Sequence, residues 1–466
     1  MNKVIFFILS LSSILLFYNG DVPHFSFRVY ITSLIIQIFS IYIIFIDDKY
    51  PYSLKKIFFL FSYFFFGVAP IVQFYSRSSF YGGRELKEVE YFLMNTLLIL
   101  IIIIYNFLYN KFFRQIQVHK IVVNKYNLNK ATPKQVLILI FLSIFSLVTT
   151  FYFLDFDINK MFFRGLYGEE ESGVASISSS SAMALMQTIR PISILCLMYY
   201  LSTPNRKIFI SILLLIIAIL TIFPTSVARF YAAAVYLPLV LISFKFTKIK
   251  NLFSLLFMSG LLFVFPFLNN FRYIDVNQKI KFEFEFDMFS SAHFDSYYNF
   301  SLILFEDLIT YGRQLIGVLL FWVPRSVWEN KPIGSGAFLA KEVNLIWENI
   351  SANYFAEGFI NFGFVGILLF LIIISYVTAL IDKKYWKFFY REENNFFQVL
   401  YFIILSMLFF AMRGDLLSST AFTVGFIVSY YFIFYVFTKL VRNNKKKLVR
   451  NNKMLYQKDR RWQSRV

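Results

Sequence analysis

The sequence predicts an all-α polytopic membrane protein with about twelve transmembrane helices and one large extracytoplasmic loop. Three observations predict this fold class. Hydrophobic residues make up 58% of the 466 residues and charged residues only 16%, which is more apolar surface than one soluble core can hide. Apolar runs long enough to cross a bilayer as helices recur along the whole chain. Basic residues gather on one side of these runs.

The apolar runs are each interpreted as one transmembrane helix, because about 20 apolar residues cover the hydrocarbon core of a bilayer. The first run carries one basic residue and lacks a small-x-small cleavage site, so it is expected to be an uncleaved span rather than a signal peptide. The twelve spans are expected at residues 3–18, 28–46, 57–75, 91–108, 135–154, 182–202, 208–223, 228–244, 252–268, 359–381, 397–412 and 420–438.

The distribution of charge predicts the orientation of these spans. With the N-terminus in the cytoplasm, the inner segments hold most of the 46 Lys and Arg but few of the 27 Asp and Glu. Since basic connections stay on the cytoplasmic side of a membrane, both termini are expected to be cytoplasmic. Orientation therefore explains the net charge of +19, and no nucleic acid is expected as a partner.

The chain is expected to have four parts. Residues 1–268 hold the first nine spans, and residues 359–439 hold the last three. Between them, residues 269–358 form a large extracytoplasmic loop with short interfacial helices, one of them at 317–323. Residues 440–466 form a basic cytoplasmic tail expected to touch anionic lipid headgroups. Because loops without a function tend to be short, the large loop is where a site is expected.

The inventory of reactive residues excludes several kinds of chemistry. The one cysteine, Cys196, lies in an apolar run, so a disulfide within the chain and a cysteine-rich metal site are both excluded. The three histidines lie far apart in sequence, which argues against a zinc site. No GxxxxGK[ST] phosphate-binding loop occurs, so an ATP-driven pump is not expected. No metal and no cofactor are predicted.

One stretch of the large loop, residues 321–336 (FWVPRSVWENKPIGSG), places two cations beside helix-breaking residues. A proline is expected to end the interfacial helix, and the Lys331-Pro332 pair and two glycines to form the next turn. Trp328 is expected either to anchor the loop at the membrane interface or to stack on a sugar ring. Arg325 and Lys331 would then lie at the outer surface, where an anion could bind.

Several arginines lie within spans or where spans join outer segments, and a cation there is costly unless it faces a partner or a wet cavity. Each could form an ion pair inside the bundle, or anchor a helix by extending its side chain to the surface. Alternatively, they could line a cavity for a polyanion, because a guanidinium group binds phosphate oxygens in pairs. A lipid-linked pyrophosphate fits both the arginines and the membrane. These residues are Arg190, Arg229, Arg272, Arg325 and Arg413.

Two acidic residues are candidates for a general base. Glu357 lies where the tenth span begins, and Asn353 and Asn361, four residues to either side, share its face if the segment is helical. A half-buried carboxylate there could accept a hydroxyl proton, although a hydrogen-bonded structural acid is the alternative. Asp295 follows His293 by two residues, so the two would share a site only in a turn or extended segment. His293 is otherwise interpreted as a partly exposed loop histidine.

Three segments carry a resemblance to a known family. VPRSVWENKPIGSG contains a Pro-Arg…Lys-Pro loop, NYFAEGFINFGFVG places a Glu and Asn-Phe-Gly before a span, and AMRGDLLSST contains a late Arg-Gly. These segments resemble the corresponding ones of the O-antigen (oligosaccharide repeat-unit) polymerases of the Wzy type. The layout of twelve spans with one large outer loop late in the chain is also similar to that family. The motifs lie within roughly 300–420, whereas the layout covers the whole chain.

The resemblance implies a GT-C-like glycosyltransferase architecture and a defined reaction. The protein would take polyprenyl-pyrophosphate-linked oligosaccharides at the outer face of the cytoplasmic (inner) membrane. It would move the growing glycan from one lipid carrier to the non-reducing sugar of another repeat unit, with no metal and no nucleotide. The product would be O-antigen of lipopolysaccharide or a related surface polysaccharide. Its partners would be the lipid-linked oligosaccharide, the bilayer, and the chain-length regulator and flippase of the same pathway.

Under this hypothesis the candidate residues divide into three roles. A carboxylate would deprotonate the acceptor hydroxyl, and an arginine would stabilise the negative charge on the leaving pyrophosphate. The catalytic candidates are Glu357, Asp295 and Arg325. The candidates for binding pyrophosphate are Arg190, Arg229, Arg272, Arg325, Lys331 and Arg413, and those for binding sugar are Trp328, Asn353 and Asn361.

Other functions remain open at the level of sequence. An O-antigen ligase has a similar layout but uses the lipid A core as acceptor. A flippase or another transporter of lipid-linked oligosaccharide is the alternative from a different class, but such transporters have two similar halves and short loops. The loop at 269–358 has no counterpart in the first half of the chain. A membrane acyltransferase would need a catalytic histidine in or beside a span, for which His293 is poorly placed.

Overall fold

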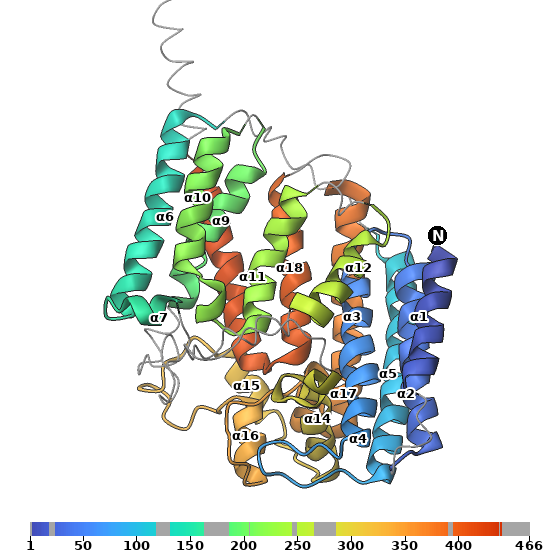
Figure 1. Cartoon of the computed structure of the whole chain (residues 1–466). Helices are drawn as coiled ribbons and strands as arrows, with labels where there is room; N and C mark the ends of the chain where they lie inside the picture. The colour runs from blue at the N-terminus through green and yellow to red at the C-terminus, as the bar shows by residue number, and fades with distance from the viewer. Residues whose placement is uncertain are drawn as a thin grey trace, which may run out of the picture.

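The computed structural model describes residues 2–17, 24–117, 131–162, 186–204, 206–244, 249–264, 286–389, 395–437 and 439. Within these residues every regular element is helical. Figure 1 shows a bundle of long helices, with several short helices gathered at one end, the lower end in that view. We call this the loop end, because the short helices belong to residues 286–353 of the predicted large loop.

The long helices belong to both halves of the chain. They are α1 (Asn2–Phe17), α2 (Phe27–Tyr42) with η1 (Ile43–Asp47), α3 (Leu54–Phe61) with η2 (Ser62–Val68) and α4 (Ala69–Tyr75), α5 (Glu88–Gln115), α6 (Pro133–Phe153), α9 (Ile192–Leu201), α10 (Ile208–Thr221), α11 (Arg229–Ser243), α12 (Leu252–Ser259) with η6 (Gly260–Val264), α17 (Tyr354–Lys384) with η10 (Tyr385–Phe389), α18 (Asn395–Arg413) and an unlabelled helix, Leu416–Phe437. The short elements are α7 (Ile158–Phe162), η4 (Pro224–Ser226), η8 (Phe286–Ser290), η9 (Ala292–Phe294), α14 (Ser296–Phe305), α15 (Arg313–Leu319) and α16 (Ser335–Glu342).

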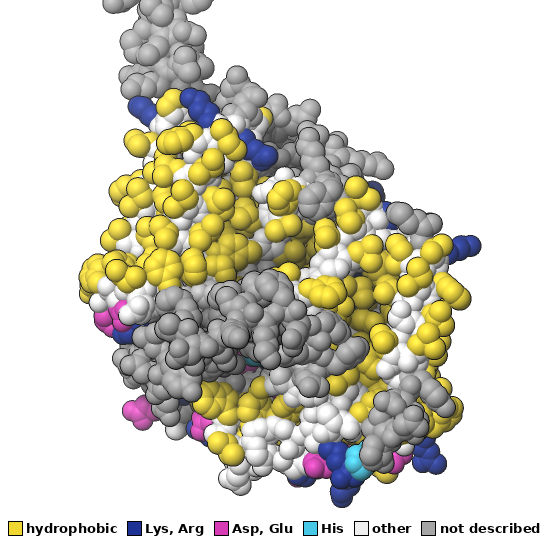
Figure 2. Space-filling model, in the orientation of Figure 1, with side chains coloured by type: hydrophobic (Ala, Val, Ile, Leu, Met, Phe, Trp, Pro, Cys, Tyr) yellow, Lys and Arg dark blue, Asp and Glu magenta, His cyan; other side chains and the backbone are white. Residues whose placement is uncertain are grey.

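Eight of the described helical segments are long and apolar enough to cross a membrane, and three shorter apolar helices accompany them. Hydrophobic side chains cover the sides of the bundle, whereas charged side chains gather towards its two ends (Figure 2). Exposed phenylalanines such as Phe107 and Phe141 would be unfavourable in water but are ordinary against lipid tails. The fold is therefore that of a helical polytopic membrane protein, and the number of twelve spans stays a prediction.

Local sequence signals explain where several helices begin. Ser53 caps α3 by accepting a hydrogen bond from the backbone N–H of Lys56 at 2.9 Å. In α6, Thr132 and Gln135 form a capping box, and Pro133 occupies the first turn, where its missing N–H costs nothing. Asn353 caps α17 by accepting from two backbone N–H groups. The helix starts thus satisfy donors that a membrane or a packed core would otherwise leave unpaired.

Two hydrophobic cores meet along α11 and α18. One core joins α1–α5, α12, α14 and α17, and the other joins α6, α9, α10 and the helix Leu416–Phe437. Different faces of α18 pack into the two cores: Phe402 and Phe409 belong to the first core, and Ile403 and Met407 belong to the second. The two halves therefore share α18 as a common wall, with α11 packed along it.

The segment α17 is two helices joined by a sharp reversal. Phe362 and Gly363 have non-helical backbone angles, and Gly363 adopts a φ of 62°, which a residue with a Cβ rarely tolerates. A Cβ added at Gly366 would overlap the carbonyl oxygen of Gly358, so the two arms touch through their backbones. The sequence predicts that Glu357 lies directly before the tenth span. That prediction is corrected, because Glu357 lies on an arm that folds back against the start of the long helix.

Candidate functional site

Two of the predicted pyrophosphate-binding arginines meet at the loop end of the bundle. Arg229 is the first residue of α11, and its Nη2 donates to Nε2 of His293 in η9. Arg413 is the last residue of α18, and its Nε donates to the backbone carbonyl of His293 at 3.2 Å. Its Nη2 lies 3.3 Å from Oδ1 of Asp295, which makes an ion pair. We call Arg229, His293, Asp295 and Arg413 the arginine cluster.

Phe230 and Asp295 hold the guanidinium group of Arg413 in place. The guanidinium carbon lies 4.7 Å from the centre of the Phe230 ring, a distance at which the ring face attracts a cation. Since Phe230 follows Arg229 in α11, one turn of α11 contributes to the positions of both arginines. An arginine that is held in this way loses little further conformational freedom when it binds an anion.

Asp295 is fully buried and accepts hydrogen bonds from three separate parts of the chain. Its donors include Oγ of Ser351 at 2.6 Å, the hydroxyl of Tyr81 at 3.0 Å and Nδ2 of Asn299 at 3.0 Å. A carboxylate with its lone pairs occupied in this way is poorly placed to accept a substrate proton. Its catalytic role stays a prediction, and the geometry favours a role in positioning Arg413.

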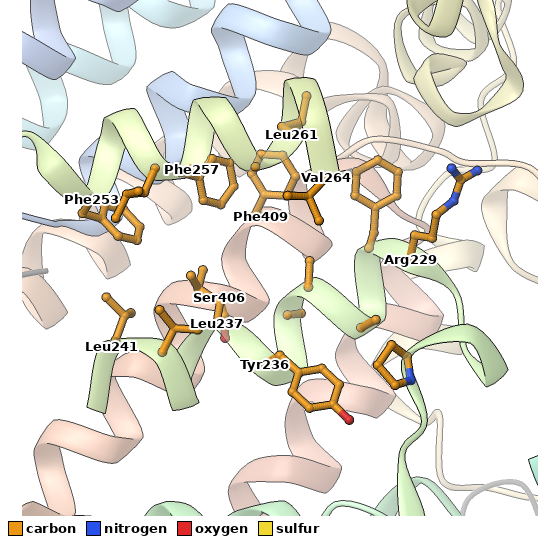
Figure 3. Close-up of a pocket in the computed structure, with 18 residues that line it drawn as sticks. Arg229, Tyr236, Leu237, Leu241, Phe253, Phe257, Leu261, Val264, Ser406 and Phe409 are labelled. Carbon is orange, nitrogen blue, oxygen red and sulfur yellow. The ribbon is translucent and has the colours of Figure 1, made fainter. Parts of the chain in front are cut away.

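An apolar cavity of about 380 Å³ begins beside Arg229 and extends between α11, α12 with η6, and α18. Its walls are almost entirely hydrocarbon, and the few polar side chains that line it include Arg229, Tyr236 and Ser406. Figure 3 shows Arg229 at one end of the cavity and Leu241 and Phe253 at the other. The cavity is therefore an apolar channel at the depth of the spanning helices, with a cation, Arg229, at its loop end.

The other predicted acid, Glu357, lies at a separate junction. It is fully buried and accepts from Oγ of Ser335 at 2.7 Å and from the backbone N–H of Leu416 at 2.8 Å. Its carboxylate thus ties α16 to the first residue of the helix Leu416–Phe437. The alternative of a hydrogen-bonded structural acid describes this arrangement, and a catalytic role for Glu357 stays a prediction.

Asp415 lies beside Glu357 and explains the first glycine of the GSG sequence, Gly334. The backbone N–H of Ser418 donates to its Oδ1 at 3.0 Å, and backbone N–H groups of Ser335 and Gly336 in α16 lie close enough to favour its charged form. Desolvation raises the pKa of Asp415, and these backbone donors act in the opposite direction. A Cβ on Gly334 would overlap the Asp415 carboxylate. The motif is therefore a close-packing contact between the loop and the bundle.

The predicted sugar-binding amides both have partners within the protein. Asn353 accepts from the backbone of Phe355 and Ala356 and donates to the carbonyl of Ser296. Asn361 donates to the carbonyl of Glu357 at 2.8 Å and accepts from the backbone N–H of Leu315 at 2.7 Å. Asn361 lies within α17, whereas Asn353 is the residue that caps it, and both side chains bond to the backbone here.

The side chains of Arg325 and Lys331 bond to the backbone of their own loop and make no contact with the arginine cluster among the described residues. Nζ of Lys331 donates to the carbonyls of Phe321 and Val323, at 2.6 and 2.9 Å. Arg325 donates to the carbonyls of Lys331 and Pro332. Burial, and then the neighbouring Arg325, lower the pKa of Lys331. The expected turn is present, but its two cations donate hydrogen bonds to backbone carbonyls of the same loop, whereas the prediction was that they bind an anion.

The remaining candidates lie elsewhere. Trp328 is partly buried in the same loop, and the helix expected at 317–323 is instead α15, which ends at Leu319. Arg190 is buried and donates to the carbonyl of Thr221 and to Oγ of Ser226, both at 3.0 Å, rather than to an acid or a cavity. Arg272 falls outside the described residues.

Sequence reasoning missed the position of His293 as the centre of the arginine cluster. It is partly exposed, as interpreted, and the short turn of η9 brings it into one site with Asp295. Because arginine only donates, Nε2 of His293 must accept, so the proton of the neutral ring lies on Nδ1. The available signal was the spacing of His293 and Asp295, but the contact with Arg229 depends on the packing of α11.

The described part of the chain contains no group of three or more His, Cys, Asp or Glu side chains that could hold a metal ion. The chain matches no family model, no curated protein and no solved structure.

Proposed function

We propose that the protein is a lipid-linked repeat-unit polymerase, a glycosyltransferase that joins polyprenyl-pyrophosphate-linked oligosaccharides into a surface polysaccharide. The observation that carries the proposal is the apolar cavity whose loop end is marked by Arg229, next to Arg413. A ligand that matches this site has a long hydrocarbon tail and a strongly anionic head. Polyprenyl pyrophosphate has both, and the loop end would face the outside of the cytoplasmic membrane.

The site supplies the main electrostatic requirement of the reaction. An acceptor hydroxyl oxygen attacks the anomeric carbon, and the bond from that carbon to the pyrophosphate oxygen breaks with its electron pair going to the pyrophosphate. Negative charge then develops on the leaving group, and fixed guanidinium groups stabilise such charge without reorganising. Arg413, held by Phe230 and Asp295, meets this requirement, and Arg229 would turn from His293 to a phosphate oxygen.

The acceptor proton needs a base near the same atoms. Glu357 is engaged by Ser335 and Leu416, and Asp295 is engaged by its own set of donors. His293 is the titratable side chain of the cluster whose Nε2 would be released when Arg229 binds phosphate. Its unprotonated nitrogen could then take the hydroxyl proton, which is the ordinary role of a neutral imidazole.

Reconstitution tests this proposal directly. The purified protein is placed in liposomes with a purified lipid-linked repeat unit as sole substrate, and products are separated by length. Longer lipid-linked glycans without any nucleotide sugar are expected, and Arg413→Ala is expected to abolish them while remaining folded in detergent. A parallel arm with lipid A core as acceptor separates polymerase from ligase. Transfer to that core only, or movement of the substrate across the bilayer with no new bond, would refute the polymerase.

A further inference from the structure

A second cavity of about 620 Å³, which we call the loop cavity, lies at the loop end and shares no lining residue with the apolar cavity. Residues Asp307–Thr310, the first turn of α15, residues Asn330–Ile333 and one face of α16 line it. Its volume lies within the range of small-ligand sites, and its walls mix polar and apolar groups. None of the predicted site residues except Lys331 belongs to it, and Lys331 points its ammonium group to backbone carbonyls.

The decisive side chain of the loop cavity is Gln314. The residue as a whole is only 6% exposed, but its amide atoms are not among the fully buried polar atoms without partners in the described residues, so the amide keeps access to the cavity. An amide that opens into a cavity can exchange hydrogen bonds to water for hydrogen bonds to a ligand at little cost. Since Gln314 lines the cavity, a ligand that supplies both a donor and an acceptor would complete it.

The walls of the loop cavity are fixed by hydrogen bonds from outside it. Thr310 donates through its backbone N–H and its hydroxyl to the carbonyl of Ile360. On the opposite wall, Arg325 binds the carbonyls of Lys331 and Pro332. The cavity is therefore formed before a ligand arrives, which lowers the cost of binding.

The chemistry of the lining selects a neutral polyhydroxylated ligand. Asp307 and Glu342 offer carboxylate acceptors, and Arg313 and Lys331 balance their charge, so the lining as a whole favours a neutral ligand, to which Asn330 offers a donor. Phe338 supplies an apolar face. A sugar ring presents hydroxyls along its edge and C–H groups on its faces, so this mixture of carboxylate, amide, guanidinium and aromatic groups is complementary to it.

We infer that the loop cavity is a subsite for the saccharide part of the substrate, which it holds independently of the lipid carrier. The nature of the saccharide rests on the proposed function, whereas the existence of a saccharide site rests on the cavity. In a polymerase, such a subsite would hold several sugars of a repeat unit while the arginine cluster holds the pyrophosphate. Gln314 is then a residue for binding and specificity, with no part in the chemical step.

Saturation-transfer NMR tests the inference without the lipid. The probe is the repeat-unit oligosaccharide released by mild acid from its lipid carrier, added to the full chain in nanodiscs. Wild-type protein is expected to bind it, and Gln314→Leu, which keeps the shape but removes the amide, is expected to weaken binding about tenfold or more. The matched control is Gln115→Leu, an identical substitution at an exposed position of α5, which is expected to bind as wild type does.

The outcomes separate the subsite from the proposed function. Binding that is unchanged in Gln314→Leu, or absent in wild type, overturns the subsite even if polymerisation is observed. Binding that is lost in Gln314→Leu but kept in the control establishes the subsite even if no polymerisation occurs. Asn330→Leu, at an exposed lining position, is the second variant if Gln314→Leu fails to fold, and it is expected to weaken binding in the same way.

Discussion

At the scale of single residues, the arginines of this chain have three different uses. Arg190 caps a backbone carbonyl inside the bundle, and Arg325 fastens a loop. Arg413 instead combines an ion pair, a carbonyl contact and an aromatic face, at the end of a helix that borders the apolar cavity. Sequence treats these residues alike because each is a cation near an apolar run, whereas only their partners reveal which could bind a phosphate.

The first prediction concerns Arg413. Replacing it by lysine keeps the charge but removes the planar group that reaches Asp295, His293 and the ring of Phe230 together. The expected rate of chain extension falls by about 10²-fold for Arg413→Lys, and by more for Arg413→Ala. Single-turnover assays with saturating lipid-linked substrate measure this. A lysine variant with the wild-type rate would show that charge alone matters, and would remove the role assigned to the guanidinium geometry.

At the scale of elements, the contact between α16 and the bundle depends on two glycines. A Cβ on Gly336 would overlap the backbone carbonyl of Ile350, and backbone cannot move aside as a flexible side chain can. Together with Asp415 and Glu357, this contact joins the segment at 321–336 to the start of the last described helix. The GSG sequence reads as an ordinary turn, and its packing role becomes visible only with Asp415 opposite it.

The second prediction follows from this contact. Gly336→Ala is expected to lower the free energy of unfolding by about 1–3 kcal/mol, because α16 must shift away from Ile350. The matched control is Gly260→Ala in the α12–η6 helix, where a Cβ would meet nothing within 4 Å. That control is expected to be neutral or to stabilise by up to about 1 kcal/mol. Thermal unfolding in detergent compares the two, and equal midpoints would exclude close packing as the reason for the glycine.

The third prediction concerns pH and Asp415. Its pKa is raised above the ordinary value of 3.8, chiefly by desolvation, so the folded protein binds this proton more tightly than the unfolded chain does. The resulting stabilisation is fully present below 3.8 and is lost as pH rises through the folded pKa. Melting midpoints are therefore expected to fall as the pH rises above about 4, and to fall less in Asp415→Asn. Equal slopes in both proteins would contradict the assignment.

At the scale of the whole molecule, hydropathy predicts most of the fold and little of the site. Apolar runs locate the long helices to within a few residues, since span length is set by the bilayer. The reversal at Phe362 and Gly363 was not predicted, because a run of apolar residues continues through it. The contacts that hold the fold-back, such as the close approach of Gly358 to Gly366, come from residues that pack together only in the folded chain. Arg413 meets His293 across 120 residues of chain, a proximity that no local pattern encodes.

The last prediction tests the apolar cavity as the site of the lipid tail. The cavity lies where α11 and α18, the helices shared by the two cores, meet α12, and Ala233 is one of its exposed lining residues. Filling that space with Ala233→Trp should exclude a polyprenyl chain without disturbing either core, so chain extension should fall about tenfold or more while the melting midpoint changes little.

The control is Val148→Trp on α6, 55% exposed on the apolar side of the bundle, which is expected to keep full activity. Liposome assays at limiting substrate measure the difference, since a lost tail contact weakens binding before it slows the chemical step. Full activity in Ala233→Trp would mean that the tail lies elsewhere, and the arginine cluster would then lack the apolar partner on which the proposed function depends.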